Sequence, residues 1–134
     1  MDIIEGKDMT AEEIRGWIET VNKEFKLEDK NEISQNYFMA IKNLCVFMRG
    51  DGMYAVLLPC PDMWGKLEIG VMSYYIVPEK RNIRSFLYLQ REIEKEAKKR
   101  GAKSISQGSH LVGDRLYLYL QRNGYKVASM RKEL

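Results

Sequence analysis

The sequence predicts a mixed α/β domain in which helices cover one sheet, with the element order ααβββαβαβ. Three observations lead to this class. Apolar residues recur every three to four positions in some segments and form β-prone runs in others. Glycine, proline and asparagine separate these segments. The chain has 134 residues, about the length of one domain, and a single layer cannot bury its own apolar face. We therefore expect residues 1–134 to form one domain.

The composition argues against disorder and against a membrane protein. Hydrophobic residues make up 45% of the chain and charged residues 31%, with only 3 prolines, so the chain should fold alone. The longest apolar run, Met53 to Cys60, is far shorter than the roughly 20 residues of a membrane span. The acidic opening Met1 to Glu5 lacks the features of a signal peptide. We expect a soluble, cytoplasmic protein with no membrane partner.

Cysteine usage and charge give no sign of a metal site or of a nucleic-acid partner. Cys45 and Cys60 have no metal-ligand spacing, and each lies in an apolar segment. The 22 basic and 19 acidic side chains give a net charge of +3, which does not require a polyanionic partner. The sequence leaves the oligomeric state open, a homodimer included.

Two helices open the predicted order. Thr10 and Glu13 form a capping box, in which each side chain satisfies a backbone donor of the other residue. The charged stretch at residues 28–31 should stop this helix. Helical spacing predicts the first helix over residues 11–26 and a second over residues 32–42, from Ile14, Trp17, Ile18, Val21, Phe25, Ile33, Tyr37, Phe38 and Ile41.

Three strands follow. Leu44 to Met48 and Met53 to Leu58 flank a turn whose glycines and Asp51 can supply the positive φ angles of a tight hairpin. A second turn at residues 61–65 leads to a long strand from Lys66 to Val77. The alternate residues of this strand are too apolar for a solvent-facing side, which predicts a central strand covered on both faces: Ile69, Val71, Ser73, Tyr75 and Val77.

The helical period returns after Pro78, which ends the long strand. A long amphipathic helix begins at Ile83 and stops at Gly101. We then expect a strand at residues 103–107 and a loop at residues 108–110. A last helix is capped by Asp114 and ended by Asn123-Gly124, and a final strand spans residues 125–130.

The segment from residue 66 to residue 134 resembles the GNAT family of acyl-CoA N-acyltransferases in its order of elements. That family joins a strand to a helix through the signature Q/R-x-x-G-x-G/A, whose backbone amides bind the pyrophosphate of acyl-CoA. The resemblance implies that acetyl-CoA binds at this place, and the corresponding residues here are Ile76, Val77, Arg81, Asn82, Ile83, Arg84, Ser85 and Phe86.

Two positions depart from the family signature. Arg84 stands where the first glycine is expected, and Phe86 stands where the second small residue is expected. Larger side chains could narrow the cradle for the pyrophosphate. Alternatively, Arg81 and Arg84 lie three residues apart and could bind phosphate through their guanidinium groups.

The resemblance also suggests candidate catalytic residues. Family members place a tyrosine, the acid for the departing thiolate, four residues before a Gly-Phe or Gly-Tyr pair, but Leu120 holds that position here. Tyr117, one turn earlier on nearly the same helix face, is the substitute. A base must keep the attacking amine neutral, and His110, the only histidine, is the first candidate. Glu68 is the second.

The resemblance implies an N-acetyltransferase that moves the acetyl group of acetyl-CoA to an amine-bearing acceptor by direct attack in a ternary complex. The acceptor class stays open between small molecules and proteins. The altered signature leaves an alternative: a catalytically degenerate GNAT-fold protein that inhibits or scaffolds a host protein. The short chain with Val77-Pro78-Glu79 is also similar to GNAT-like proteins of phages.

Overall fold

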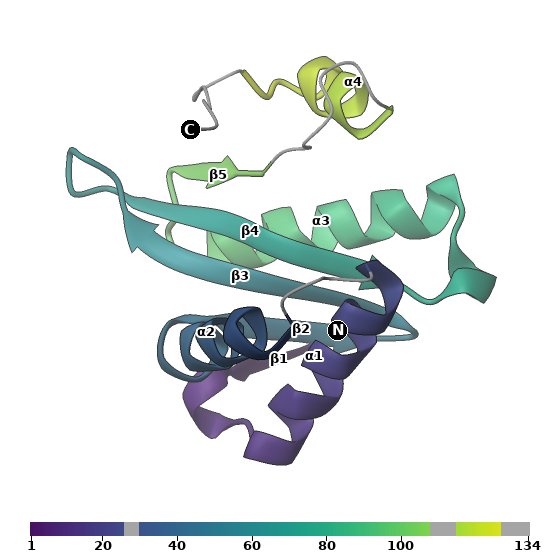
Figure 1. Ribbon diagram of the computed structural model, residues 1–134. Helices are drawn as coiled ribbons and strands as arrows, with labels where there is room; N and C mark the ends of the chain where they lie inside the picture. Colours follow the sequence, from purple (N-terminus) through teal and green to yellow (C-terminus); the bar gives the residue numbers. More distant parts are fainter. Residues whose placement is uncertain (26–29, 108–114, 127–134) are drawn as a thin grey trace, which may run out of the picture.

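The structure is a computed structural model that describes residues 1–25, 30–107 and 115–126, and it confirms the mixed α/β class. Figure 1 labels its elements. The strands are β1 (Asp2–Glu5), β2 (Val46–Gly50), β3 (Met53–Pro61), β4 (Leu67–Ile76) and β5 (Ser104–Ser106). The helices are α1 (Ala11–Phe25), α2 (Lys30–Leu44), α3 (Ile83–Lys99) and α4 (Arg115–Arg122), with short 3-10 helices η1 (Gly6–Asp8) and η2 (Pro78–Lys80).

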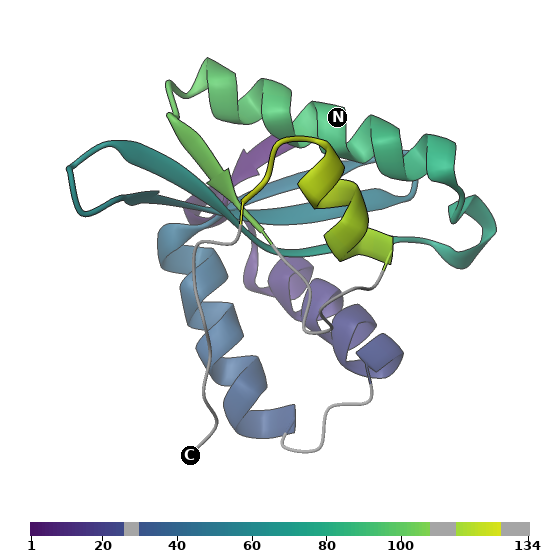
Figure 2. The same ribbon diagram turned by 90° about the horizontal axis from the view of Figure 1, so that it is seen from above.

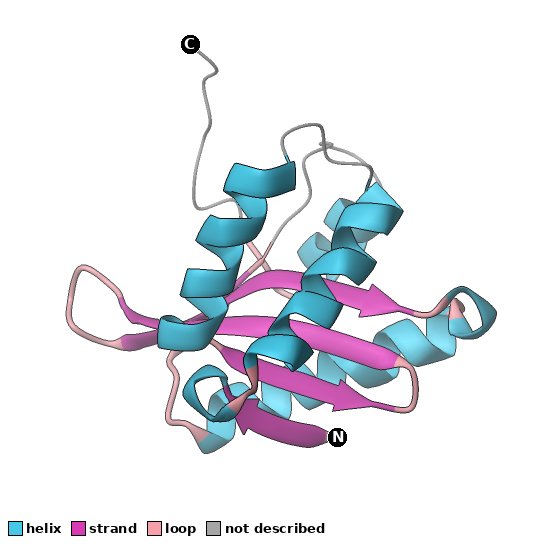
Figure 3. Ribbon diagram, turned by 60° about the horizontal axis from the view of Figure 1, so that its bottom comes forward, coloured by secondary structure: helices cyan, strands magenta, loops and turns pink. Residues whose placement is uncertain are grey.

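The five strands form one sheet in the order β1-β2-β3-β4-β5. Neighbouring strands are antiparallel except β4 and β5, which run parallel. Because parallel neighbours need a crossover connection, the chain passes through α3 between them. Figures 2 and 3 show that α3 covers one face of the sheet, whereas α1 and α2 cover the other. The sheet is therefore enclosed between two helical layers.

Each face of the sheet has its own group of buried side chains. Leu89, Ile93 and Ala97 of α3 pack on one face with Val46, Met48, Met53, Ala55, Leu57, Ile69 and Ile76. The α1 and α2 side contains Met9, Ile14, Trp17, Ile18, Val21, Ile41, Cys45, Phe47 and Val56. The helical spacing seen in the sequence thus places the apolar side of α1 and α3 on the sheet.

The capping box at the start of α1 is confirmed. The backbone N–H of Thr10 donates to Glu13 Oε1 at 3.0 Å, and the N–H of Glu13 donates to Thr10 Oγ1 at 3.1 Å. The helix then covers residues 11–25. The second helix is longer than predicted, because it includes Leu44, which the sequence assigned to the following strand.

The tight hairpin between β2 and β3 is also confirmed. Asp51 and Gly52 alone connect the strands, with φ angles of 53° and 74°. A Cβ atom on Gly52 would lie 2.7 Å from Val77 Cγ2, so this position also requires a residue without a side chain. The N–H of Val77 donates to the carbonyl oxygen of Gly52 at 2.9 Å, which ties the end of β4 to the hairpin.

The first strand was not predicted. β1 is a four-residue edge strand that pairs with β2, with Ile3 opposite Met48 and Ile4 opposite Phe47. Its sequence is short and acidic and has no alternation, so only the remote partner β2 makes it a strand. With β1 included, the order begins with a strand instead of a helix.

β4 is a central strand, as predicted, but its alternation is broken. Val56 pairs with Ser73, whereas the next residue, Leu57, pairs with Val71, so Met72 is an extra residue in β4. Such a β-bulge changes the faces of the residues that follow it. Ile69 and Val71 contact the core on the α3 side, whereas Tyr75 packs on the α1 and α2 side. The expectation that these alternate residues share one face is therefore wrong beyond Val71.

The last predicted helix is present as α4, and its end is as expected. Gly124 has a φ of 89°, and the N–H of Tyr125 donates to the carbonyl oxygen of Leu120 at 3.0 Å. Tyr125 and Lys126 are not in a strand, and the rest of the predicted final strand lies outside the described residues, as does the Asp114 cap. No helix among the described residues is long and apolar enough to cross a membrane.

Candidate active site

β4 and β5 separate halfway along β4. Their pairing is limited to Glu68 with Ser104, Ile69 with Ile105 and Gly70 with Ser106. β4 continues to Ile76, so among the described residues its second half has a strand neighbour on only one side. Figure 2 shows β5 at an angle to β4 with α4 beside the gap. The edge of β4 beyond Gly70 on the β5 side, which has no strand partner among the described residues, is called the open edge below.

The open edge leads to the start of α3. Asn82 is the N-cap, and its Oδ1 accepts the N–H of Ser85 at 2.9 Å. A helix leaves its first N–H groups without partners in the helix, and here those of Ile83 and Arg84 are not bonded to any described residue. These groups and the helix dipole favour an anion at this end.

Arg81 joins three elements around the turn before α3. Its Nε–H donates to the carbonyl oxygen of Ile76 at 2.7 Å, and its Nη2 lies 2.7 Å from Glu24 Oε1 at the end of α1. The guanidinium carbon also lies 5.3 Å from the ring centroid of Tyr75. Arg81 therefore holds the β4 end, α1 and the turn together, and its charge is already paired with a carboxylate.

A cavity of about 350 Å³ lies at this junction. Its lining comes from the end of β4, the start of α3 and the end of α1: Glu24, Tyr74, Tyr75, Ile76, Arg81, Asn82 and Phe86. The ring of Phe86 packs against Tyr74 at 6.1 Å and against Tyr119 of α4 at 5.0 Å between centroids. An aromatic group thus stands where α3, α4 and the open edge of β4 meet.

The comparisons with solved structures identify the fold. A protein of Pyrococcus furiosus described as an acetyltransferase superposes with a TM-score of 0.74 at 17% identity, over 99% of this chain and 97% of its own. The ribosomal-protein-alanine N-acetyltransferase of Brucella melitensis gives a TM-score of 0.62 at 14% identity, over 99% and 94%. An aminoglycoside acetyltransferase from an uncultured soil sample gives 0.62 at 11%, over 100% and 98%. The chain has the GNAT fold.

Sequence comparisons do not add to this result. No protein-family model matches the sequence, and no curated protein matches it significantly. The likeness to GNAT acetyltransferases therefore rests on the arrangement of the elements, which covers nearly all of this chain and of its structural neighbours.

The GNAT fold brings together four of the residues predicted to bind the cofactor. Ile76, Arg81, Asn82 and Phe86 line the cavity at the end of β4. The N–H of Val77 is bonded to Gly52, so a free N–H on β4 must come from an earlier residue. The side chain of Ile83 is 67% exposed, and this residue can contribute its backbone N–H.

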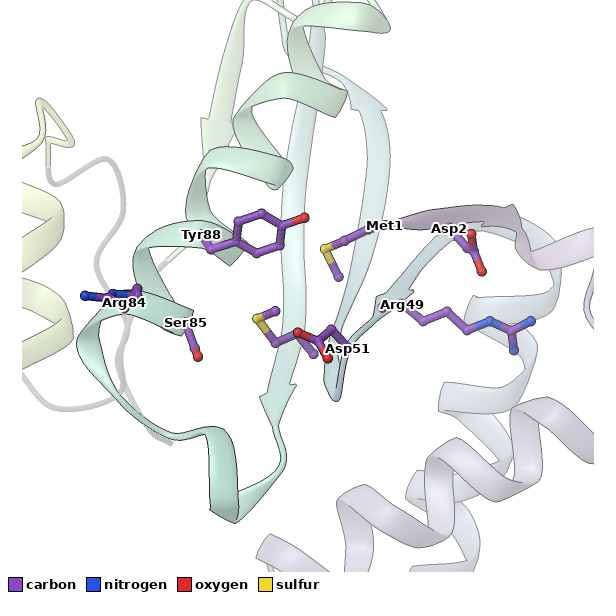
Figure 4. A pocket seen from close by; sticks show the side chains of 9 residues that line it. Met1, Asp2, Arg49, Asp51, Arg84, Ser85 and Tyr88 are labelled. Carbon is purple, nitrogen blue, oxygen red and sulfur yellow. The ribbon is translucent and has the colours of Figure 1, made fainter.

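Arg84 and Ser85 lie on another side of α3. They line a second cavity, of about 520 Å³, between α3 and the edge formed by β1 and β2 (Figure 4). In this view the Arg84 side chain points away from the other labelled side chains, while the Tyr88 hydroxyl points toward Met1. The two arginines therefore do not converge on one phosphate site in this structure.

The predicted catalytic residues are placed only in part. His110 lies outside the described residues; Tyr117 belongs to α4, and its side chain is also outside them. Glu68 is on the paired half of β4, where its Oε1 accepts from Ser104 Oγ at 3.3 Å. Leu120, at the position of the family tyrosine, is buried with 4% exposure.

Polar residues near the open edge were missed by the sequence reasoning. Gln107 directly follows β5, and its Nε2 donates to Gln90 Oε1 and to the Tyr125 hydroxyl, both at 2.8 Å. Burial raises the pKa of Tyr125. On the other face, Tyr37 of α2 bonds to Ser73 of β4. The only sequence signal for the contact between Tyr37 and Ser73 was the helical spacing that predicted Tyr37 to pack on the sheet.

The residues at the site fit an acyl-CoA. The free N–H groups of Ile83 and Arg84 suit a pyrophosphate, and the open edge of β4 suits an extended arm that ends in a thioester. The Phe86 ring makes the approach to these N–H groups narrower than a small residue would. The carboxylate of Glu24 makes the same approach less positive. Among the described residues, no group of three His, Cys, Asp or Glu side chains could hold a metal ion.

Proposed function

We propose that this protein is an N-acetyltransferase that transfers the acetyl group of acetyl-CoA to an amine. The observation that carries the proposal is the open edge of β4, which runs from Val71 to the N–H groups at the start of α3. The anion site at the start of α3 and the β4 edge without a described partner next to it together suit a phosphate-bearing thioester. The GNAT neighbours support the same activity.

In this proposal the chain binds and orients the two reactants. The backbone N–H groups of Ile83 and Arg84 hold the pyrophosphate, and a β4 N–H beyond Gly70 donates to the thioester carbonyl. Bound acetyl-CoA supplies an acetyl group activated as a thioester. Holding the amine beside that carbon provides much of the rate, because the reaction becomes effectively unimolecular.

The proposed proton-transfer residues are those that the resemblance to the GNAT family suggests. The amine attacks only when neutral, so a base must take its proton, and His110 is our first candidate with Glu68 as the second. Tyr117 is the proposed acid for the departing thiolate. If His110 is the base, kcat/KM should rise with pH to a plateau above a pKa near neutrality, and His110→Ala should flatten this rise. If Tyr117 is the acid, Tyr117→Phe should lower kcat with little change in KM.

A calorimetric titration with acetyl-CoA tests binding at the start of α3. Ile83→Pro removes one N–H donor, while proline at the first helical position keeps the helix. The extended backbone of Asn82, with φ −149° and ψ 169°, is compatible with a following proline. A hydrogen bond to a charged group is worth about 1.5–3 kcal/mol, so the Kd should rise about tenfold or more.

Ala11→Pro is the matched control, because it makes the same change at the first position of α1. It should leave the Kd for acetyl-CoA unchanged. Absence of both heat and a melting shift at millimolar acetyl-CoA with the unmodified protein would reject the acetyltransferase, because binding without heat would still stabilise the fold. Release of free thiol with a panel of amines, among them an alanine-initiated peptide, spermidine and kanamycin, then tests transfer. The comparisons do not favour the alternative, a non-catalytic binding protein.

A further inference from the structure

A chain of hydrogen bonds connects both N-terminal helices to the open half of β4. The indole Nε1–H of Trp17 on α1 donates to the Tyr37 hydroxyl on α2 at 3.3 Å. The Tyr37 hydroxyl in turn is hydrogen-bonded to Ser73 Oγ on β4. The Trp17 ring is fixed by aromatic neighbours, with centroids 5.3 Å from Phe47 and 5.5 Å from Tyr54. The series of hydrogen bonds therefore begins at an indole whose ring is held in place by its neighbours.

The direction of this chain follows from its donors and acceptors. An indole N–H can only donate, so the oxygen of Tyr37 accepts from Trp17. Either direction leaves one of the two hydroxyl protons without an acceptor among the described residues, and the more acidic phenol is the better donor of the pair. Tyr37 therefore donates to Ser73. Burial raises the pKa of Tyr37, so the phenol keeps this proton at neutral pH.

Ser73 then has its own proton available for another partner. A hydroxyl that accepts one hydrogen bond still has one donor and a second lone pair. No other hydrogen-bond partner of Ser73 Oγ occurs among the described residues. The side chain is half-buried, so a ligand can reach it. Tyr37 thus orients the Ser73 hydroxyl so that the Ser73 O–H points away from Tyr37, toward another partner.

The β-bulge puts Ser73 on the face where Tyr37 lies. Without the extra residue Met72, Ser73 would share the α3 face with Ile69 and Val71. The bulge turns it to the face covered by α1 and α2. Bulges are common beside active sites, where they redirect a side chain. Ser73 also lies beyond Gly70, the last β4 residue that pairs with β5, so it belongs to the half of β4 that has no described strand partner on that side.

We propose that Ser73 is a catalytic residue whose hydroxyl donates a hydrogen bond to the carbonyl oxygen of the acyl thioester, with Tyr37 and Trp17 as positioning residues. This inference rests on the proposed function. During transfer the acceptor nitrogen bonds to the carbonyl carbon, the carbon–sulfur bond breaks with its electron pair on sulfur, and the proton lost by nitrogen ends on the sulfur. Ser73 keeps its proton and stabilises the charge that develops on the carbonyl oxygen.

The carbonyl group itself provides a readout that needs no acceptor. The protein is mixed with acetyl-CoA labelled with ¹³C at the acetyl carbonyl, and the infrared C=O band of the bound thioester is recorded. A hydrogen bond to the oxygen weakens the C=O bond, so the band of the unmodified protein should lie below that of free acetyl-CoA. Ser73→Ala should shift it back toward the free value, Tyr37→Phe should shift it part of the way, and Ser73→Thr should restore it.

The second readout is the rate of thioester loss, to water or to any amine that serves as acceptor. Loss of one donor to the carbonyl oxygen costs about 10²-fold or more, so Ser73→Ala should lower kcat by that factor. Thr20→Ala removes a hydroxyl elsewhere on α1, and Tyr88→Phe removes one from an exposed tyrosine of α3. Both control variants should behave like the unmodified protein.

The outcomes separate this inference from the proposed function. If acetyl-CoA binds with the same Kd to the unmodified protein and to Ser73→Ala but the C=O band is the same in both, Ser73 does not contact the carbonyl and the assignment is overturned. Binding without any thioester loss above the rate in buffer would also overturn it. Failure of acetyl-CoA to bind at all would instead remove the proposed function and this inference together.

Discussion

The carboxylate of Glu24 lies 2.7 Å from the guanidinium of Arg81 and connects the end of α1 to the turn that precedes α3. The pair is partly exposed, with about two-fifths of the Arg81 side chain and one-third of the Glu24 side chain accessible. Within the proposed function, this carboxylate competes with the phosphates of acetyl-CoA for the same positive charge. The pair also keeps α1 in contact with the end of β4 through the bond from Arg81 to Ile76.

Glu24→Gln should therefore strengthen the binding of acetyl-CoA. A partly exposed ion pair is worth about 0.2–1 kcal/mol, so the Kd should fall by about 1.4-fold to fivefold at low salt. The gain should shrink as salt is added, because exposed charges are screened. Calorimetric titration measures both effects. Glu19→Gln, an equal change of charge on the exposed side of α1, is the control, and an equal gain there would show a general effect of net charge.

The capping box gives the protein a specific dependence on acid. Hydrogen bonds from the Thr10 backbone and side chain, together with Arg49, lower the pKa of Glu13 from its usual 4.5. A lowered pKa in the folded state stabilises the protein fully above pH 4.5, and this contribution is lost as pH falls through the folded-state value. Urea unfolding between pH 7 and pH 3 should show this loss. Glu13→Gln should be less stable than the unmodified protein at pH 7, and the difference should shrink below pH 4.5.

The hairpin between β2 and β3 should not tolerate a side chain at Gly52. Gly52→Ala combines a φ of 74° with a Cβ only 2.7 Å from Val77 Cγ2. Gly65 also has a positive φ, of 76°, but a Cβ atom added there would meet no other atom within 4 Å. Backbone strain alone costs about 1–2 kcal/mol, so Gly65→Ala should lose that much and Gly52→Ala clearly more. Equal losses in a denaturant titration would contradict the steric contribution of Val77.

The two cysteines should differ in reactivity. Cys45 is buried, and burial raises its pKa to about 11, so almost no thiolate forms at pH 8. Cys60 is a free, exposed thiol in β3. Iodoacetamide at pH 8 should alkylate Cys60 alone in the folded protein and both cysteines in urea. Peptide mass spectrometry identifies the modified residues, and rapid alkylation of Cys45 without urea would contradict its placement.

Elements specified by local chemistry could be predicted from the sequence. The capping box of Thr10 and Glu13 and the Asp51-Gly52 turn involve neighbouring residues, so their patterns identify them directly. β1 could not be predicted, because its strand conformation depends on pairing with β2, more than 40 residues away. The bulge at Met72 was also hidden, since no glycine or proline adjoins it and β-prone residues lie on both sides of it.

The place of the candidate site at the start of α3 stays a prediction from the sequence, whereas the contacts around it come from the structure. The start of α3 follows from the strand–Pro78–helix pattern. The contacts of Arg81 with Glu24 and Tyr75 depend on tertiary packing, which no local pattern encodes. Arg84 and Ser85 face another cavity because successive residues of a helix point about 100° apart. The Tyr37–Ser73 contact required both the bulge and the packing of α2 on the sheet.

The short pairing between β4 and β5 also affects the local stability of the protein. Only three residue pairs join β5 to the sheet, although α4 and Tyr125 follow it in the chain. Local opening is easiest where backbone hydrogen bonds are few and partly exposed. Amide protons of residues 104–106 should therefore exchange with deuterium before those of β3, which is paired on both sides. Ligands that bridge the two strands would slow this exchange, so the edge that would hold acetyl-CoA in the proposed function is also a part of the sheet that opens before its centre.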